Sequence, residues 1–327
     1  MPKVSVIIPI YKVEAFIVRC VNSLMRQTLS DIEYIFVNDA TPDNSMALLQ
    51  LTVHSYPERK EQVRIVTHEY NQGLPAARNS GLAVATGKYI FHCDSDDYME
   101  DEMLEQLYLF AEGQHADIVW CDWYLSFRQK ERYMSQPAYN TPLEALKGML
   151  GGAMKYNVWN KLVRRDLYID NHIIFPSGYG MGEDMTMMLL FAFARKVAYL
   201  PKAFYHYVKL NTVSFSHTYS DRHLKELRYN VDRMVNFLQN QYGIQFEQEI
   251  AFFKLEAKFP FLISDGSKGE YRRWTVWFPE ANRYILQNRN VSMRSRCLQW
   301  CAWKRQFWMV WLYYWLVNRL IYGIIYK

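Results

Sequence analysis

The feature that most constrains the fold is a regular alternation of short apolar runs and amphipathic stretches over about the first 125 residues. The apolar runs have the length of buried strands, and the stretches between them have apolar residues at helical spacing. Strands are predicted at 4–9, 33–37, 63–66, 88–93 and 118–123, and helices at about 14–26, 43–51, 74–85 and 102–112. This alternation predicts an α/β fold, with a mainly parallel sheet flanked by helices on both faces.

Acidic residues directly follow two of these predicted strands. Asp39 stands at the end of the second strand, and the cluster Asp94-Ser95-Asp96-Asp97 stands at the end of the fourth. Because Asp and Ser also make good turns and helix caps, the cluster alone is as compatible with a simple turn as with a metal site. Ligands of parallel sheets bind beyond the carboxyl ends of strands, so we expect both acidic positions to face one crevice.

The spacing within the cluster suits a hard divalent cation. Carboxylates two residues apart on a turn, as Asp94 and Asp96 are, can aim at one ion. Mg²⁺ keeps several waters and takes only one or two protein carboxylates, so a short acidic turn is sufficient. Such an ion neutralises the charge that develops when a sugar–diphosphate bond breaks. The pattern therefore fits an enzyme that acts on a nucleotide sugar.

Four motifs, in order along the first 125 residues, closely resemble the signature of family 2 glycosyltransferases, which have the GT-A (Rossmann-like) fold. They are Pro9 with Tyr11 in the first strand, residues 38–45 after the second, residues 71–81 before the fourth and residues 87–90 leading into it. Asn38 and Ala40 depart from the Asp-Asp-Gly-Ser usually found after the second strand. The resemblance weakens beyond residue 125.

The resemblance implies a role for each motif residue. Asp96 is expected to be the ligand of Mg²⁺ or Mn²⁺, and Asp39 to hydrogen-bond the base or ribose. Arg78 is expected to approach the phosphates and the acidic region. Asp97 is expected only to stabilise the turn. The residues expected to bind the nucleotide sugar, a UDP-sugar, are Pro9, Tyr11, Asp39, Asn71, Arg78, Asp94 and Ser95.

A second acidic motif lies further along the chain. Glu183 and Asp184 follow a glycine-rich stretch and open a predicted apolar helix. Acidic residues at a helix start are also ordinary capping, and the residues alone leave both interpretations open. In the family that the chain resembles, such a pair follows a Trp-Asn-Lys-Leu segment, here residues 159–162. The resemblance then implies that Asp184 is the general base of an inverting transfer, with Glu183 orienting the acceptor.

Two further patterns bear on the activity. A late histidine completes the metal site in some GT-A enzymes, and His206 and His217 are candidates, although either is equally at home in a partly buried strand. Residues 270–274 read Glu-Tyr-Arg-Arg-Trp and lack the Gln of the Gln-x-x-Arg-Trp motif of processive synthases. We therefore expect transfer of a single sugar per acceptor.

The end of the chain is rich in aromatic residues, with five of the ten Trp in the last 28 residues. Trp, Tyr and basic side chains favour the membrane–water interface. As a helix, residues 307–326 are about 30 Å long, which just reaches across a bilayer, but Arg319 opposes a span. Three arrangements stay open: a helix lying in the membrane surface, which we favour, burial against the domain or a second subunit, and a true span.

Composition limits the classes of protein. A net charge of +5 is too mild for a dedicated nucleic-acid binder, so no nucleic-acid partner is expected. Five cysteines without a CxxC pair indicate neither a disulfide framework nor a zinc knuckle. Because a strand pattern begins at Val4, no signal peptide is expected. We predict a cytoplasmic protein, peripheral to the inner face of the cell membrane, with homo-oligomers possible.

The predicted organisation has three parts. Residues 1–125 form the nucleotide-sugar-binding half of the catalytic domain, residues 126–217 form its acceptor-binding half, and residues 218–327 form a helical extension. The predicted function is metal-dependent transfer of one sugar to a glycan or lipid-linked acceptor in cell-surface polysaccharide synthesis. The alternatives are a nucleotidyltransferase that releases pyrophosphate and an inactive membrane-docked module that binds nucleotide sugars.

Overall fold

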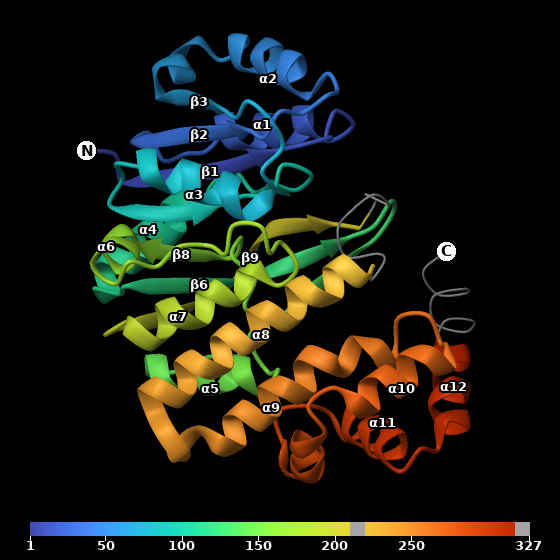
Figure 1. The fold of residues 1–327 in the computed structure, drawn as a ribbon. Helices are drawn as coiled ribbons and strands as arrows, with labels where there is room; N and C mark the ends of the chain where they lie inside the picture. Colours follow the sequence, from blue (N-terminus) through green and yellow to red (C-terminus); the bar gives the residue numbers. More distant parts are fainter. Residues whose placement is uncertain (210–219, 318–327) are drawn as a thin grey trace. The chain divides into compact units, whose positions relative to one another are not determined.

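A computed structural model describes residues 1–209 and 220–317 of the chain. The chain packs as two compact units, the first formed by residues 1–145 with 156–230 and the second by residues 146–155 with the chain from 231 onward. The first unit contains a nine-stranded sheet, and the second is built from helices (Figure 1).

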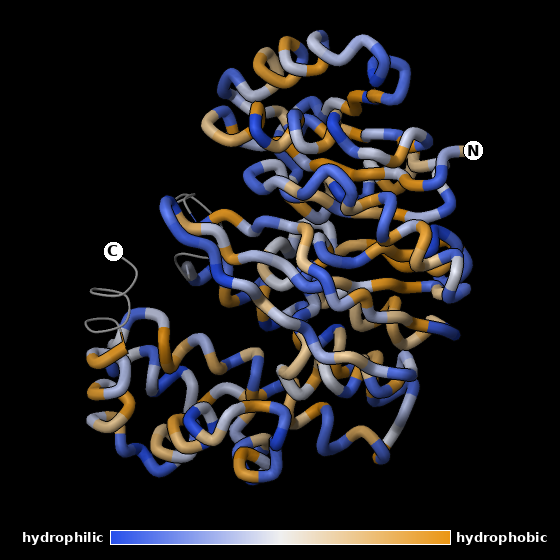
Figure 2. Tube along the Cα trace, turned by 180° about the vertical axis from the view of Figure 1, so that it is seen from behind, coloured by the Kyte–Doolittle hydropathy of each residue, from blue (hydrophilic) through white to orange (hydrophobic). Residues whose placement is uncertain are grey.

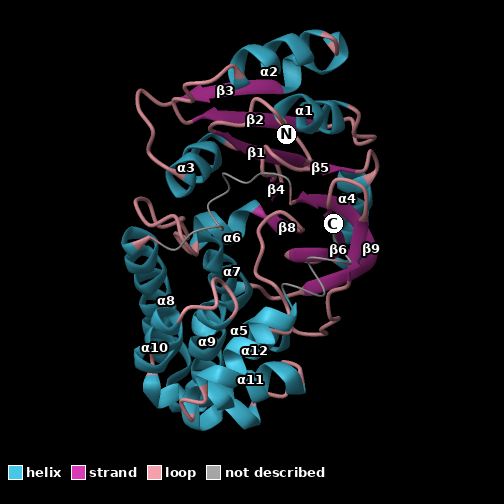
Figure 3. Ribbon diagram, turned by 90° about the vertical axis from the view of Figure 1, so that its right-hand side faces the viewer, coloured by secondary structure: helices cyan, strands magenta, loops and turns pink. Residues whose placement is uncertain are grey.

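The strands of the first unit follow the order β3-β2-β1-β4-β8-β6-β9-β5, with β7 added on β6. Figure 3 shows β3, β2 and β1 side by side at one edge of the sheet. Their bounds are β1 Val4–Ile10, β2 Ile32–Asn38, β3 Val63–Thr67, β4 Tyr89–His92, β5 Tyr98–Met99, β6 Ile118–Ser126, β7 Glu131–Met134, β8 Lys161–Arg164 and β9 Val197–Val208. Every residue of β1 and β4 is buried. Such buried runs are typical of strands covered on both faces, and Figure 2 shows apolar residues along the strands of the sheet.

The direction of the strands changes midway through the sheet. β3, β2, β1 and β4 are all parallel, as the alternation predicts. β8 then pairs antiparallel with both β4 and β6, while β9 runs parallel to β6. The α/β class with a helical C-terminal region is confirmed, but the whole sheet is mixed, because the chain returns to insert β8 between two earlier strands.

Helices of the first unit pack against this sheet, α3 on β1 and β2, and α4 on β6 and β9. The bounds are α1 Ile17–Met25, α2 Ser45–His54, α3 Leu74–Val84, α4 Met103–Gln114, α6 Arg165–Asp170 and α7 Thr186–Phe193. Two helices contribute residues to both units. Both α5 Pro142–Leu150 and α8 Asp221–Tyr242 begin among residues of the first unit and end among residues of the second.

One glycine of the sequence motifs is required by the packing of α3 on β1. A Cβ added at Gly81 would lie 2.4 Å from Cγ2 of Ile7, closer than carbon atoms approach without a shift. Since Ile7 sits in the middle of the buried strand β1, it has little room to move. The motif glycine therefore sets the distance between α3 and the sheet, and with it the position of every side chain on α3.

The second unit packs around α9 Glu247–Lys258, α10 Lys268–Val276, α11 Met293–Trp303 and α12 Phe307–Leu316. Lys258 is fully buried in it, and its Nζ lies 4.1 Å from the ring centroid of Trp274. This Nζ donates hydrogen bonds of 2.7 Å to the carbonyl of Trp277 and to Oδ1 of Asn282. Burial lowers the pKa of Lys258 to about 7.

Helix α12 exposes large apolar side chains, among them Trp308 at 64% and Trp311 at 51%. It begins at Phe307, where a helix is predicted, and is separated from α11 by Arg305 in a left-handed conformation with φ 56°. The rest of the predicted tail helix, with Arg319, lies outside the described residues. Within the part of the chain that the structure describes, no helix is long and apolar enough to cross a bilayer.

Candidate active site

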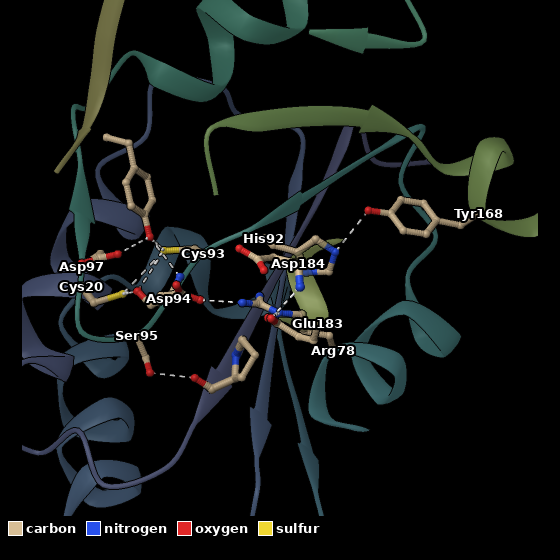
Figure 4. A network of polar contacts seen from close by, with 12 residues as sticks. Cys20, Arg78, His92, Cys93, Asp94, Ser95, Asp97, Tyr168, Glu183 and Asp184 are labelled. Carbon is tan, nitrogen blue, oxygen red and sulfur yellow. Dashed lines mark hydrogen bonds and ion pairs between the residues drawn. The ribbon is translucent and has the colours of Figure 1, made fainter. Parts of the chain in front are cut away.

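The turn after β4 is fixed to neighbouring strands by its own side chains (Figure 4). Ser95 donates from Oγ to the carbonyl of Pro9 at 2.7 Å, which joins the end of β4 to the end of β1. Asp97 is fully buried and accepts from the hydroxyl of Tyr205 at 2.9 Å and from the backbone N–H of Val208 at 2.7 Å. Asp97 thus fastens the turn to β9, while Asp94 and Asp96 remain partly exposed.

A buried arginine connects the two acidic motifs. Arg78, on α3, is 2% exposed and bonds Asp94 at 2.9 Å through Nη2 and Glu183 at 3.1 Å through Nε (Figure 4). Burial opposes its charge, but the carboxylates of Asp94 and Glu183 outweigh this effect and raise the pKa of Arg78. The structure therefore brings together residues that are 105 positions apart, with Arg78 bonded to both acidic motifs.

Asp184 sits one residue beyond this ion-paired group. Helix α7 directly follows a short 3₁₀ turn, Glu183–Met185, in which the N–H of Asp184 donates to Oε2 of Glu183 at 2.6 Å. Burial, reinforced by the charge of Glu183, raises the pKa of Asp184 well above its ordinary value. A carboxylate with a raised pKa is a stronger base, as a group that removes a proton near neutral pH needs to be.

The Trp-Asn-Lys-Leu segment, residues 159–162, is connected to the acidic turn through Tyr205. Trp159 stacks on Tyr205 with ring centroids 4.7 Å apart, and Tyr205 bonds the acidic turn. Lys161 is buried, and its Nζ donates to the carbonyl of Asn157 at 2.7 Å and to Oδ1 of Asn160 at 2.8 Å. Burial lowers the pKa of Lys161 to about 7, against the attraction of nearby acidic groups that include Asp184.

Asp39 is more enclosed than the sequence suggests, since it is 2% exposed. Its Oδ1 accepts from Nδ1 of His68 and from the N–H of Gln72, both at 2.7 Å. Its Oδ2 accepts from Nδ2 of Asn71 at 2.9 Å and from the N–H of Gly73 at 2.8 Å. With two acceptor positions on each oxygen filled, the carboxylate orients the loop that carries Asn71, and a bound base would have to displace one of these bonds.

The remaining predicted nucleotide-sugar residues lie around this loop and the turn after β4. Pro9 pairs in register with Val37 near the ends of β1 and β2, and Tyr11 follows β1 with 40% of its surface exposed. Asn71 is exposed to solvent, although its side chain donates a hydrogen bond to Asp39. The strand ends thus bring Ser95 to Pro9 and Asn71 to Asp39.

The carboxylates after β4 suit Mg²⁺ or Mn²⁺, because these ions need only one or two protein carboxylates. Among the described residues no group of three or more His, Cys, Asp or Glu is arranged for a metal ion. His206 is buried, and its Nδ1 and Nε2 lie 2.7 Å from Glu131 and 2.9 Å from Glu100. His206 is thereby engaged by two carboxylates, and His217 lies outside the described residues.

Sequence reasoning missed two contributors to this site, Tyr205 and His68. Tyr205 supports both Asp94 and Asp97, and His68 bridges Asp39 to the hydroxyl of Ser80 at 2.8 Å. His68 directly follows β3, where ligands of such sheets bind, and this position was the available signal for it. Tyr205 lies within β9, and no local pattern marked it.

Comparison with known proteins identifies relatives over most of the chain. Residues 5–185 match the family model described as "Glycosyl transferase family 2". The "Uncharacterized glycosyltransferase EpsJ" of Bacillus subtilis is 35% identical over 77% of this chain and 70% of its own length. The "Cholesterol galactosyltransferase" of Borreliella burgdorferi is 31% identical over 80% of this chain and 74% of its own length.

Solved structures with the same fold are more distant in sequence. Residues 1–349 of TarS from S. aureus, in complex with UDP-GlcNAc, match with a TM-score of 0.66 and 21% identity over 97% of this chain and 92% of that one. The mannosyltransferase PcManGT from Pyrobaculum calidifontis, in complex with GDP-Man and Mn²⁺, matches with a TM-score of 0.54 and 14% identity over 96% and 87%.

Proposed function

The chain belongs to glycosyl transferase family 2 and is a glycosyltransferase, and from this premise we propose that it transfers one sugar, with inversion, from a UDP-sugar to a glycan or lipid-linked acceptor. The observation that carries this proposal is the ion pairing of Arg78 with both Asp94 and Glu183. It joins the turn expected to hold the diphosphate to the turn that bears a base. A nucleotidyltransferase has no use for a base on the acceptor side in this position.

The sugar-donor side is built on the strand ends. Asp96, with Asp94, would hold Mg²⁺ or Mn²⁺, which when bound supplies charge neutralisation for the leaving diphosphate. Support for the metal comes from the carboxylate oxygens themselves, which are the ligands these ions prefer. The nucleotide sugar is proposed to contact Pro9, Tyr11, Asp39, Asn71, Asp94 and Ser95, with Arg78 acting through Asp94. Because Arg78 is buried, its part is to hold Asp94 in place at the pyrophosphate.

The acceptor side is built on Asp184. Its carboxylate takes the proton from the acceptor hydroxyl while that oxygen attacks the anomeric carbon, and the diphosphate leaves from the opposite face. Glu183 holds the backbone of Asp184 through their hydrogen bond of 2.6 Å and is itself held by Arg78. The raised pKa of Asp184 supports this role, since the carboxylate must accept a proton in the transition state.

The test of this assignment is Asp184→Asn, which keeps the size of the side chain and removes the base. Transfer should fall about 10²–10⁴-fold while UDP binding, measured by calorimetry with Mn²⁺, stays within about twofold. Unchanged transfer in this variant would show that the base lies elsewhere.

A peripheral membrane location is the second part of the proposal. The last acidic residue is Glu280, and the 47 residues after it carry eight Lys or Arg. The first 280 residues are therefore net negative, and the positive charge of the chain is concentrated in the region of the exposed Trp308 and Trp311. Aromatic and basic side chains together suit an anionic lipid surface, such as the inner face of a bacterial-type cytoplasmic membrane. This location would serve cell-surface polysaccharide synthesis on lipid-linked acceptors.

Vesicle flotation tests the membrane location. The protein should float with phosphatidylglycerol vesicles, and the double variant Trp308→Ser, Trp311→Ser should lose at least tenfold in bound fraction. Leu51→Ser removes an equally exposed apolar side chain from α2 and should bind as the unaltered protein does. Equal flotation of the double variant and the unaltered protein would contradict the proposal.

A further inference from the structure

Two exposed tyrosines stack on each other beside the turn that bears Asp184. Tyr179 lies in the loop before Glu183, and Tyr229 lies on α8. Their ring centroids are 3.6 Å apart and their planes are 10° from parallel. Despite this contact Tyr179 is 37% exposed and Tyr229 is 43% exposed. The pair therefore presents aromatic surface to solvent within the catalytic unit, which extends to residue 230.

The backbone around the pair is held by buried polar side chains of α8. Asn230 is 1% exposed, and its Nδ2 donates to the carbonyls of Tyr179 at 2.9 Å and Met181 at 3.0 Å. Glu226 is 3% exposed and accepts from the N–H of Met181 at 3.0 Å. Since buried polar groups are costly unless paired, these bonds fix the loop onto the helix. The tyrosines are thus held in place before any ligand arrives.

The loop also has the backbone shape that this position requires. Gly178 and Gly182, on either side of the tyrosine, have φ of 83° and 87°, values that residues with a Cβ rarely adopt. Two further hydrogen bonds, from the N–H of Glu183 to the carbonyl of Gly180 at 3.2 Å and from that of Met185 to Gly182 at 3.1 Å, fold the loop back. Five residue steps separate Tyr179 from Asp184, so their Cα atoms are at most about 18 Å apart.

The geometry of this stack differs from the one that two isolated aromatic rings prefer. Aromatic pairs prefer offset or edge-to-face arrangements to a face-to-face sandwich, because the faces carry like partial charge. The stack at 3.6 Å occurs where Asn230 and Glu226 hold the backbone of the loop against α8. A rigid tyrosine pair offers apolar ring surface and hydroxyl groups at little cost in conformational entropy when a ligand binds.

We propose that Tyr179 and Tyr229 form a subsite for a sugar ring of the acceptor, on the loop that leads into the base Asp184. The C–H face of a pyranose would lie on the aromatic surface, and the phenolic hydroxyls would exchange hydrogen bonds with sugar hydroxyls. This inference rests on the proposed transfer to a glycan acceptor. It assigns a specificity role to the first turns of α8, and it makes the loop clamp of Asn230 part of acceptor binding.

The experiment compares Tyr229→Ala with Tyr229→Phe, which keeps the ring. Binding of a panel of methyl glycosides of glucose, galactose, mannose and their N-acetylamino forms is measured by saturation-transfer NMR, with UDP and Mn²⁺ present. We expect at least one glycoside to bind the unaltered protein and to bind Tyr229→Ala at least tenfold more weakly. Tyr229→Phe should bind within about threefold of the unaltered protein, and UDP affinity should be the same in all three.

The outcomes separate this inference from the proposed function. If UDP binds all three proteins but loss of the ring leaves glycoside affinity unchanged, or if no glycoside binds the unaltered protein, the subsite is refuted. If the unaltered protein neither binds UDP nor hydrolyses any UDP-sugar, the proposed function itself fails. Should Tyr229→Ala be misfolded by thermal unfolding, Tyr179→Leu replaces it, with the same expected loss.

Discussion

Removing the guanidinium of Arg78 is the sharpest test of the site, because that group balances two carboxylates at once. Arg78→Met keeps most of the side-chain volume and leaves Asp94 and Glu183 without their ion pairs. Glu183 is only 7% exposed and Asp94 is 25% exposed, so water compensates little for the lost partner. Breaking a buried ion pair from one side costs about 3–5 kcal/mol, and we expect the unfolding free energy to fall by this amount.

The loss should depend on pH in a defined direction. Burial already raises the pKa of Glu183, against the attraction of Arg78, and removal of Arg78 raises it further. A carboxyl group whose pKa is higher in the folded than in the unfolded protein favours folding at low pH and loses this contribution as the pH rises. The destabilisation of Arg78→Met should therefore be greater at pH 8 than at pH 5.

Urea denaturation at the two pH values, followed by tryptophan fluorescence, measures both effects. The double variant Arg78→Met, Glu183→Gln provides the control, because it removes the uncompensated charge and should recover about 1–3 kcal/mol. A loss below about 1 kcal/mol at pH 8, or a loss that does not change with pH, would refute the argument that Arg78 compensates buried carboxylates.

Three other predictions follow from single contacts. Gly81→Ala should destabilise the protein by about 1–3 kcal/mol in urea denaturation, since the added Cβ would meet Ile7. Gly113→Ala in α4 is the control, because no atom lies within 4 Å of the added Cβ, and it should stabilise the protein by about 0.5–1 kcal/mol. Asp96→Ala should abolish Mn²⁺-dependent transfer, and chelation of the metal should do the same to the unaltered protein; undiminished turnover would remove Asp96 from the site. Because the base must be deprotonated, kcat should rise with pH through the raised pKa of Asp184; a profile flat from pH 5 to 8 would contradict that role.

Much of the parallel half of the sheet could be predicted from local sequence. The composition of apolar runs such as Val4–Ile10 and Ile32–Asn38 is enough to predict that they are buried strands. Apolar residues at helical spacing between these runs predict the crossover helices. Parallel neighbours joined by helices have few alternative arrangements. The proximity of the ends of β1 and β4, shown by the bond from Ser95 to Pro9, followed from this topology without any coordinates.

The second half of the sheet could not be obtained in this way. β8 Lys161–Arg164 is four residues long and lies between β4 and β6, which precede it in sequence by about 70 and 40 positions. Nothing in its local pattern tells which edges it joins. Lys161 reads as a solvent-exposed charge, yet it is buried, because β8 lies between β4 and β6. The oxygens that bond its Nζ come from Asn157 and Asn160, which are close to it in sequence.

The sequence by itself determined the α/β class, the positions of the two acidic motifs and the family, because strand composition, periodicity and motif order are local properties of the chain. Only the tertiary structure decided how those motifs cooperate. Arg78 joins Asp94 to Glu183, the acceptor positions of Asp39 are filled by its own loop, and Asn230 of α8 holds the loop before the base. Such pairings depend on which distant segments exclude water together, and that is settled by packing rather than by the residues of any one segment.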